Sequence, residues 1–342
     1  MKKDLKSFTR KEIILEMASL EWPPYRANQI FQWIQKGCSD FAEMTNLSKI
    51  MRETLSKNYI LTSLWQVSKQ TSQDGTEKYL LELPDGELIE TVLMRYKHGN
   101  SLCLSSQVGC AMGCQFCASG MEGLSRNLSA GEMLDQILFV SRDIKERISH
   151  VVMMGSGEPL QNLEEVVKLL NIINDKQGLN ISLRHVTVST CGLVPQIYEL
   201  AEYKLPINLA ISLHAASDNI RKSMMPIAER YSIDELLEAC DAYVDKTNRR
   251  ITYEYALVPG INDYPDEINK LAQKLKGKLC HVNLIPVNPV DDVFPAHHHH
   301  KGYHHIVEFL EKEGISATIR RELGADIDAA CGQLKRRSKA DL

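Results

Sequence analysis

From about residue 100 to residue 313 the chain repeats one pattern, a short apolar strand followed by an amphipathic helix. Alternating units of this kind place their strands in parallel and join them by right-handed helical crossovers. We expect strands at Ser101–Ser106, Val151–Met154, His185–Ser189, Ile207–Leu213, Ile251–Val258 and Cys280–Pro286. We expect the helices at 129–145, 162–175, from Pro195 onward, and at 232–246, 265–276 and 302–313. The fold class is therefore α/β, with a partial TIM-type (β/α)6 barrel.

The segments on either side of this barrel have other patterns. Residues 10–60 carry apolar side chains at helical spacing, interrupted by a Pro-Pro pair. Residues 62–97 alternate between Asp-Gly turns, which is typical of a β-hairpin or small meander. We therefore divide the chain into an N-terminal module of helices and a hairpin at 1–97, the barrel at 98–321, and a C-terminal segment at 322–342.

Three cysteines, Cys110, Cys114 and Cys117, follow the first expected strand in the run C-A-M-G-C-Q-F-C. Three thiolates at this spacing can hold a [4Fe–4S] cluster and leave one iron open. The open iron is where S-adenosylmethionine (SAM) binds in enzymes that cleave it to a radical, and the triplet resembles the radical-SAM signature. The other readings are buried free cysteines or half of a zinc site. Zinc sites usually offer paired C-x2-C units, and the sequence has no second pair.

Composition limits the classes of protein to which the chain can belong. Its formal net charge is −4, so strong nonspecific binding to nucleic acid is not expected. No apolar run approaches the roughly 20 residues of a membrane span, and no apolar signal segment follows the charged start. Nine cysteines, three of them at cluster spacing, indicate the reducing cytoplasm rather than a disulfide framework. Basic groups near both ends could contact phosphate or form a solvated face.

Chemistry in barrels of this kind gathers at the C-terminal ends of the strands. The turn Gly155–Pro159, G-S-G-E-P, follows the second expected strand. Its glycines permit a close backbone approach, and Glu158 adds a charge. Further polar residues end the later strands, at Ser189, Ser212, His214 and Asn288.

Motifs over nearly the whole chain resemble the RlmN/Cfr family of RNA adenine methyltransferases. The closest resemblance lies in Cys103–Cys110, C-L-S-S-Q-V-G-C, and in Asp326–Leu334, D-I-D-A-A-C-G-Q-L. Further matches are Tyr25–Ile30, Glu90–Val92, Asn127 with Leu128, Ser212–Ala215, Met225–Ile227, Pro259–Asp263 and Val282–Pro286.

This resemblance implies a radical methylation of adenine. Carbon 2 of adenine is electrophilic, so an ordinary attack on the methyl group of SAM is not available. In the family, one SAM methylates the thiolate that matches Cys331, and a second SAM, reduced by the cluster, yields a radical that takes hydrogen from that methyl group. The carbon radical adds to adenine. The thiolate that matches Cys103 then attacks the sulfur of Cys331, forms a disulfide and releases the methylated base. Glu90 matches the general base that removes the ring proton.

The resemblance also carries over the contacts to SAM. They fall on Gly157, Glu158, Ser189, Ser212, Leu213, His214 and Asn288. Hydroxyls and amides at strand ends can hold ribose and carboxylate groups. For His214 a role as a satisfied core histidine stays open beside a direct contact.

The implied substrates are 23S rRNA near the peptidyl-transferase centre and the tRNA adenine beside the anticodon. Such a base must leave its stack to reach a site inside a barrel mouth, and the N-terminal module suits recognition of RNA by shape. An electron donor such as flavodoxin or ferredoxin is implied as well. We expect a monomer in the cytoplasm, without contact to a membrane.

Three alternatives accompany this reading. A Cfr-type enzyme methylates carbon 8 of the same rRNA adenine, which confers antibiotic resistance, and uses the same catalytic residues. Carbon 2 is favoured by the turn Gly157–Leu160 and by the basic tail after Cys331. A non-catalytic Fe–S RNA-binding protein would not need both Cys103 and Cys331. The run His297–His300 could bind a metal ion, although we favour a solvated loop.

Overall fold

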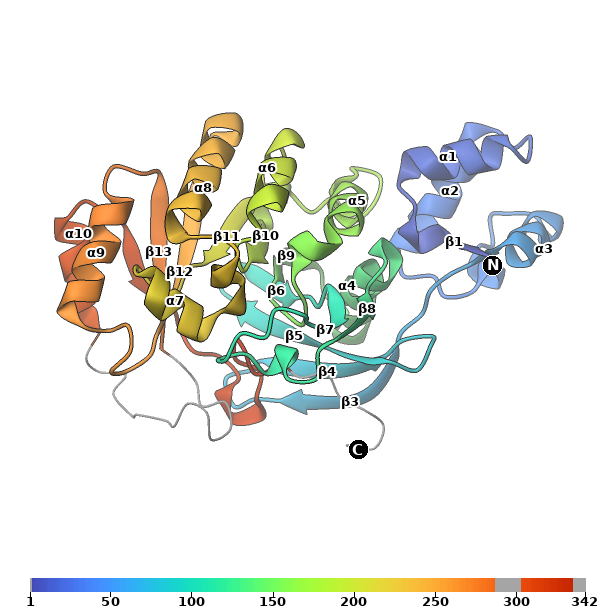
Figure 1. Ribbon diagram of the computed structural model, residues 1–342. Helices are drawn as coiled ribbons and strands as arrows, with labels where there is room; N and C mark the ends of the chain where they lie inside the picture. The colour runs from blue at the N-terminus through green and yellow to red at the C-terminus, as the bar shows by residue number, and fades with distance from the viewer. Residues whose placement is uncertain (1, 287–302, 335–342) are drawn as a thin grey trace.

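A ten-stranded sheet runs through the computed structural model, which describes residues 2–286 and 303–334 (Figure 1). The strand order across the sheet is β14-β13-β12-β11-β10-β9-β6-β5-β4-β3. The strands are β3 (Trp65–Thr71), β4 (Glu77–Glu82), β5 (Leu88–Tyr96), β6 (Gly99–Cys103), β9 (Ile148–Met153), β10 (Val186–Thr190), β11 (Asn208–Ser212), β12 (Ile251–Leu257), β13 (Cys280–Pro286) and β14 (Ala317–Ile319). In the described part of the chain the outer strands β14 and β3 do not pair with each other, so the sheet is open.

The neighbouring strands β6 and β9 to β14 run parallel to one another. All but β14 lie where the repeating pattern predicted strands, and the α/β fold with a partial barrel is confirmed. The additional strand β14 has 3 residues, too few for an alternation of polar and apolar side chains to be recognised. Because these strands are parallel, their C-terminal ends meet at one edge of the sheet.

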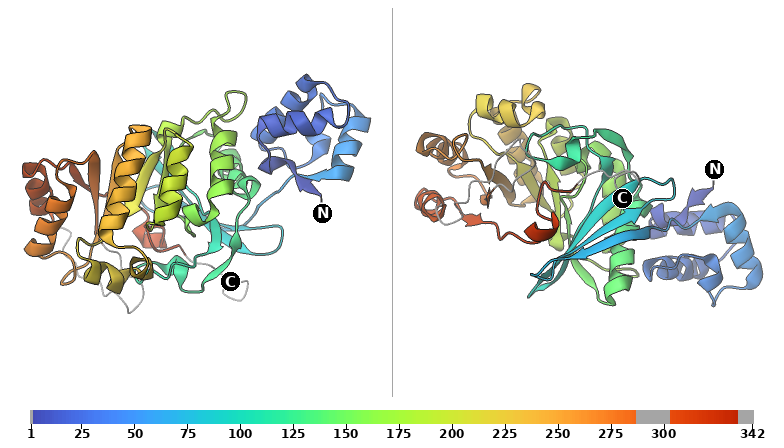
Figure 2. Two further views of the ribbon diagram at one scale, coloured as in Figure 1. Left: turned by 45° about the horizontal axis from the view of Figure 1, so that its top comes forward. Right: turned by 90° about the horizontal axis from the view of Figure 1, so that it is seen from below.

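Helices α4, α5, α6 and α8 lie side by side over one face of the parallel strands (Figures 1 and 2). The helices of this part are α4 (Ala130–Ile144), α5 (Leu163–Asn174), α6 (Val194–Glu202), α7 (Asp218–Met224), α8 (Ile233–Thr247), α9 (Pro265–Leu275) and α10 (His304–Lys312). Capping boxes begin α4 and α8, each with a serine and a glutamate three residues later. Helix α7 was not predicted, because its 7 residues are too short for a periodic pattern. No helix among the described residues is long and apolar enough to cross a membrane.

Strands β3, β4 and β5 form the antiparallel meander predicted within residues 62–97. Strand β5 pairs in turn with β6, the first strand of the parallel part. The meander therefore extends the sheet of the barrel directly. The domain boundary at residue 97 falls in the turn between these two paired strands, and it stays a prediction.

The first 60 residues form a small helical unit beside α4 (Figure 1). It consists of α1 (Arg10–Ala18), α2 (Pro24–Gln35) and α3 (Lys49–Asn58), with β1 (Lys3–Asp4) paired to β2 (Tyr59–Ile60). Lys6 and Asp135 of α4 form an ion pair of 2.5 Å, and both side chains are fully buried. The second carboxylate oxygen of Asp135 accepts the backbone N–H of Leu64 at 2.8 Å. This pair ties the unit to the barrel, because a buried charge without its partner is costly.

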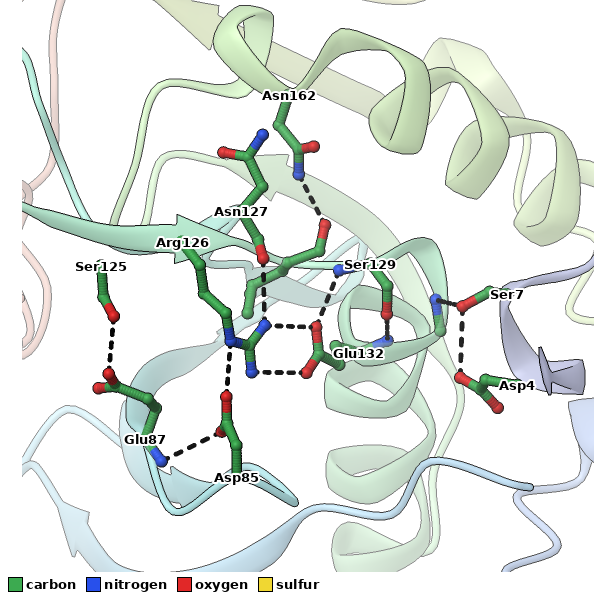
Figure 3. A network of polar contacts seen from close by, with 12 residues as sticks. Asp4, Ser7, Asp85, Glu87, Ser125, Arg126, Asn127, Ser129, Glu132 and Asn162 are labelled. Atoms are coloured by element: carbon green, nitrogen blue, oxygen red, sulfur yellow. Dashed lines mark hydrogen bonds and ion pairs between the residues drawn. The ribbon is translucent and has the colours of Figure 1, made fainter. Parts of the chain in front are cut away.

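A second polar network surrounds the N-terminal end of α4 (Figure 3). Arg126 donates hydrogen bonds of 2.7–2.9 Å to Glu132 of α4 and to Asp85 in the β4–β5 turn. Arg126 belongs to β8 (Leu124–Asn127), which follows the cysteine loop. Strand β8 pairs with β7 (Gln107–Gly109), which precedes the loop. The network therefore fixes the base of the cysteine loop against the sheet.

Replacing Lys6 by methionine should destabilise the protein strongly. The substitution leaves the Asp135 carboxylate buried without a cation, which typically costs about 3–5 kcal/mol. Lys3→Met is the matched control, because the Lys3 side chain in its pair with Glu16 is 59% exposed, and such pairs contribute about 0–1 kcal/mol. Urea unfolding of the two variants measures the difference. A loss in K6M no larger than that in K3M would show that the buried pair does not hold the helical unit in place.

Candidate functional site

A solvent-connected cavity of about 960 Å³ opens at the C-terminal edge of the parallel strands. Its walls come from the cysteine loop after β7, the turn after β9, and the ends of β10 to β13. The residues predicted from sequence that line this cavity are Cys110, Cys114, Cys117, Gly157, Glu158, Ser189, Ser212, His214 and Cys331. The fold therefore brings residues from distant parts of the chain to one place.

The cysteine loop is held by neighbours on two sides. The N–H of Gln115 donates to the carbonyl of Met224, at the end of α7, at 3.0 Å. The N–H of Ala118 donates to the carbonyl of Gly332, in the C-terminal segment, at 2.7 Å. Burial and the neighbouring cysteines raise the pKa of Cys114.

The donors of this loop fit an iron–sulfur cluster better than a single metal ion. In the described residues no three His, Cys, Asp or Glu side chains converge on one metal position. In a [4Fe–4S] cluster each thiolate binds a different iron, so its cysteines stand farther apart than the ligands of one ion. Three thiols that face one cavity supply this kind of ligand, and they would lose their protons on binding iron.

The glycines of the turn after β9 are required by close packing. A Cβ atom at Gly155 would lie 2.6 Å from the carbonyl oxygen of Leu104. A Cβ atom at Gly157, whose φ is +110°, would lie 2.6 Å from the Cβ of Gln107. The turn can therefore lie against the strand that leads into the cysteine loop only because both side chains are absent.

Glu158 follows these glycines and is buried. Its carboxylate accepts the N–H of Leu160 at 3.0 Å and the N–H of Cys191 at 2.7 Å. Burial raises the pKa of Glu158, and these hydrogen bonds oppose the rise because they favour the ionised form. The carboxylate is held in place between the turn and the end of β10, facing the cavity.

Strands β10 and β11 bring Ser189 and Ser212 to the cavity at their C-terminal ends. His214 follows with a left-handed φ of +57°. Its Nδ1 accepts the N–H of Ala256 at 2.9 Å, and burial together with the charge of Arg221 lowers the pKa of His214 to about 3. The ring is therefore neutral. Because Nδ1 is an acceptor, the proton lies on Nε2 and can be donated to a ligand.

A second cavity, of about 620 Å³, adjoins the first. Cys103 of β6 and Cys331 both line it. The two cavities share the lining residues Met154, Ile285, Pro286, Arg320 and Cys331. Burial raises the pKa of Cys103 to about 12, while the charge of Arg320 opposes the rise. Cys331 is the exposed cysteine of this pair, and it lies on the wall that separates the cavities.

The segment that carries Cys331 is fixed before and after this residue. Asp326 accepts the hydroxyl of Ser72, from the β3–β4 turn, at 2.5 Å. Beyond Cys331, the carbonyl of Leu334 accepts the hydroxyl of Ser119 at 2.6 Å. The C-terminal segment thus bridges the meander and the cysteine loop, two parts of the chain that the sheet holds in fixed positions.

Two of the predicted residues that the structure describes line neither cavity. Leu213 is packed in the core, 1% exposed. Glu90 of β5 is also buried and pairs with Lys78 at 3.8 Å, and Lys78 donates to the carbonyl of Asp328 at 3.1 Å. Glu90 therefore lies beneath the C-terminal segment. Asn288 and the histidine run at 297–300 lie outside the described residues.

Sequence reasoning missed two charged residues of the first cavity, Glu254 and Arg320. Glu254 of β12 accepts the amide of Asn283 at 2.8 Å and lies 3.9 Å from Arg320. Burial raises the pKa of Glu254, and the charge of Arg320 opposes the rise. A signal was present, because a glutamate stands between Tyr253 and Tyr255 in a strand whose other residues are mostly apolar or aromatic.

Comparison with known proteins places the chain in a family. Residues 104–275 match the model of the Radical SAM superfamily, and residues 3–61 match that of the ribosomal RNA large subunit methyltransferase N-terminal domain. The probable dual-specificity RNA methyltransferase RlmN of Alkaliphilus oremlandii is 53% identical over 98% of this chain and 98% of its own length. The protein of the same name from Clostridium beijerinckii is 52% identical over 97% of this chain and 95% of its own length.

A solved structure is similar as well. The radical SAM methyltransferase from Sphaerobacter thermophilus superimposes with a TM-score of 0.90 at 43% identity, over 97% of this chain and 99% of that one. The agreement covers the helical unit, the sheet and the C-terminal segment together. The chain therefore belongs to the RlmN family of radical SAM RNA methyltransferases.

Proposed function

We propose that the protein methylates carbon 2 of an adenine in 23S rRNA and of the adenine beside the anticodon in tRNA. The observation that carries this proposal is the position of Cys331 on the wall between two cavities. One cavity holds the cysteine triplet, and the other holds Cys103. A thiol in this position can receive a methyl group on one side and present it to a base on the other.

The first cavity is the proposed site of SAM. Ser189, Ser212 and the neutral His214 would donate hydrogen bonds, and the Glu158 carboxylate would accept them from the ammonium group. Gly157 provides the close backbone approach. Leu213 would contribute through its backbone, and Asn288 is retained from the family resemblance. We propose two SAM molecules per turnover, one as methyl donor and one as radical source.

Cys110, Cys114 and Cys117 would hold a [4Fe–4S] cluster. When bound, the cluster supplies the electron that cleaves SAM and starts radical chemistry. The electron would come from a donor such as flavodoxin or ferredoxin.

The remaining steps belong to Cys331 and Cys103, which line the second cavity, and to Glu90, which is buried beneath the C-terminal segment. Cys331 would carry the methyl group and then the methylene bridge to the base. The Cys103 thiolate would attack the sulfur of Cys331, so that an S–S bond forms and the S–C bond breaks. The methylene carbon would keep the electron pair and take up a proton from solvent to become the methyl group of the product. Glu90 would accept the ring proton, and Lys78 at 3.8 Å would stabilise its charge before that transfer.

The N-terminal module at 1–97 would bind RNA, with the barrel at 98–321 and the catalytic-cysteine segment at 322–342 completing the enzyme. The match of residues 3–61 to a methyltransferase N-terminal domain supports this division. Recognition by shape suits the modest net charge of −4. We propose that the protein acts as a monomer in the cytoplasm, where these RNAs are modified.

The position of methylation can be read directly from product nucleosides. After anaerobic turnover with methyl-labelled SAM on unmodified 23S rRNA fragments and tRNA, we expect labelled 2-methyladenosine from both RNAs. Mass spectrometry of the digested RNA makes the measurement. Labelled 8-methyladenosine would assign the protein to the Cfr type. Formation of 5′-deoxyadenosine without labelled adenosine would contradict the proposed substrates. If a protein with an intact cluster forms no 5′-deoxyadenosine, the result would favour the non-catalytic reading.

Substitution of Cys103 and of Cys331 should block the reaction at different steps. Cys103→Ala should accumulate protein covalently linked to RNA, because the bond from Cys331 to the base can no longer be broken. Cys331→Ala should form neither the link nor the product, while the absorption of the cluster stays intact. Cys38→Ala is the matched control, since Cys38 is buried in the helical unit and lines neither cavity. Denaturing gels of the RNA complexes separate the cases, and free product at the normal rate from C103A would refute the resolving role.

Release of the methylated base should depend on pH. Burial raises the pKa of Cys103 to about 12, so below that pH the thiolate fraction rises about tenfold for each unit of pH. Single-turnover decay of the protein–RNA link should therefore accelerate from pH 7 to pH 9. The measurement follows the link after its formation at one fixed pH. A decay rate that is constant over this range would mean that another group, not Cys103, limits resolution.

A further inference from the structure

Arg221 of α7 is a fully buried arginine behind the first cavity. Its guanidinium donates to three backbone carbonyls, those of Cys191 at 2.7 Å, Leu213 at 3.2 Å and Ser212 at 3.3 Å. These carbonyls belong to the ends of β10 and β11, from which the SAM site is built. One guanidinium thus joins two neighbouring strand ends at the floor of the site.

The charge of Arg221 has no counter-ion in the part of the chain that the structure describes. No carboxylate there forms an ion pair with it, and its Nη1 has no hydrogen-bond partner. Asp218 acts on it only through its field, and one oxygen of Asp218 accepts the N–H of Ile233 at 2.8 Å. Buried charges in proteins are paired or lie beside a bound ion, because desolvation of a lone charge is costly. A bound anionic group beside this guanidinium would supply the missing charge.

The cysteine loop is the anionic partner that lies within reach. In α7, Met224 lies one turn beyond Arg221, and its carbonyl accepts the N–H of Gln115 from the cysteine loop. Cys191, whose carbonyl Arg221 holds, lines the cavity together with Cys114. Arg221 therefore lies on the helix that anchors the cysteine loop and holds a residue that lines the same cavity as Cys114.

We propose that Arg221 is a positioning residue that balances the charge of an iron–sulfur cluster on Cys110, Cys114 and Cys117 and thereby stabilises its reduced state. Reduction adds negative charge to the cluster. A fixed cation in a medium of low dielectric favours the more negative state, and its effect is larger there than in water. This inference rests on the cluster that the proposed function assigns to the loop.

The test is a redox titration of the reconstituted full-length enzyme, followed by electron paramagnetic resonance of the reduced cluster. Arg221→Met removes the charge, whereas Arg221→Lys keeps the charge and loses the planar fork. At a fixed potential we expect the ratio of reduced to oxidised cluster to fall about tenfold in R221M, which corresponds to about 59 mV for one electron. In R221K we expect a ratio close to that of the wild type and weaker SAM binding, because carbonyl contacts are lost.

Arg249→Met is the matched control. Arg249 also donates to a backbone carbonyl, that of Ile207 at 3.2 Å, but at the opposite end of β11. Its loss should leave the potential unchanged. A folded R221M enzyme with the wild-type potential overturns the inference. If R221M does not fold, Arg221→Gln replaces it, and equal potentials in R221Q and R221K overturn the inference in the same way. A wild-type protein that takes up no cluster would instead overturn the proposed function.

Discussion

The site depends on hydrogen bonds between the C-terminal segment and parts of the chain that precede the barrel helices. Asp326 accepts from Ser72, and the carbonyl of Asp328 accepts from Lys78, so the β3–β4 turn and strand β4 hold one side of the segment. The cysteine loop holds the other side through Ala118. Each such bond contributes only about 1 kcal/mol. Together they place an exposed thiol between two cavities, a position that a free tail would adopt only rarely.

Burial sets the state of the ionisable groups around this thiol. It raises the pKa of Glu158, of Glu254 and of Cys103, and it lowers the pKa of His214 to about 3. Backbone donors oppose this rise at Glu158, and the charge of Arg320 opposes it at Glu254. The site is therefore prepared electrostatically for ligands that bring their own charge. A cation gains from the two carboxylates, and an anion gains from the buried guanidinium of Arg221.

The features that could be predicted from the sequence are those that depend on residues close together in the chain. The repeat of strand and helix, the cysteine spacing and the glycine turn could be recognised because each rests on neighbouring residues. The position of Glu90 beneath the C-terminal segment could not, since it follows from contacts between residues far apart in the chain, such as Lys78 and Asp328, which are 250 positions apart. Glu254 and Arg320 were missed for the same reason. The pattern of a strand predicts on which face of the sheet a side chain lies, but only the assembled sheet shows which residues of other strands lie beside it. The join of β5 to β6 likewise became visible only in three dimensions.

The bond between Ser72 and Asp326 spans 254 residues, and the one between Lys78 and Asp328 spans 250. During synthesis, the partners in the meander leave the ribosome long before the segment that must dock on them. While residues 322–334 are still inside the exit tunnel, Cys331 cannot reach its place beside the meander. This thiol therefore docks only after the strands that hold it have been made. A chain stalled before residue 331 would bear most of the lining of the first cavity without this thiol.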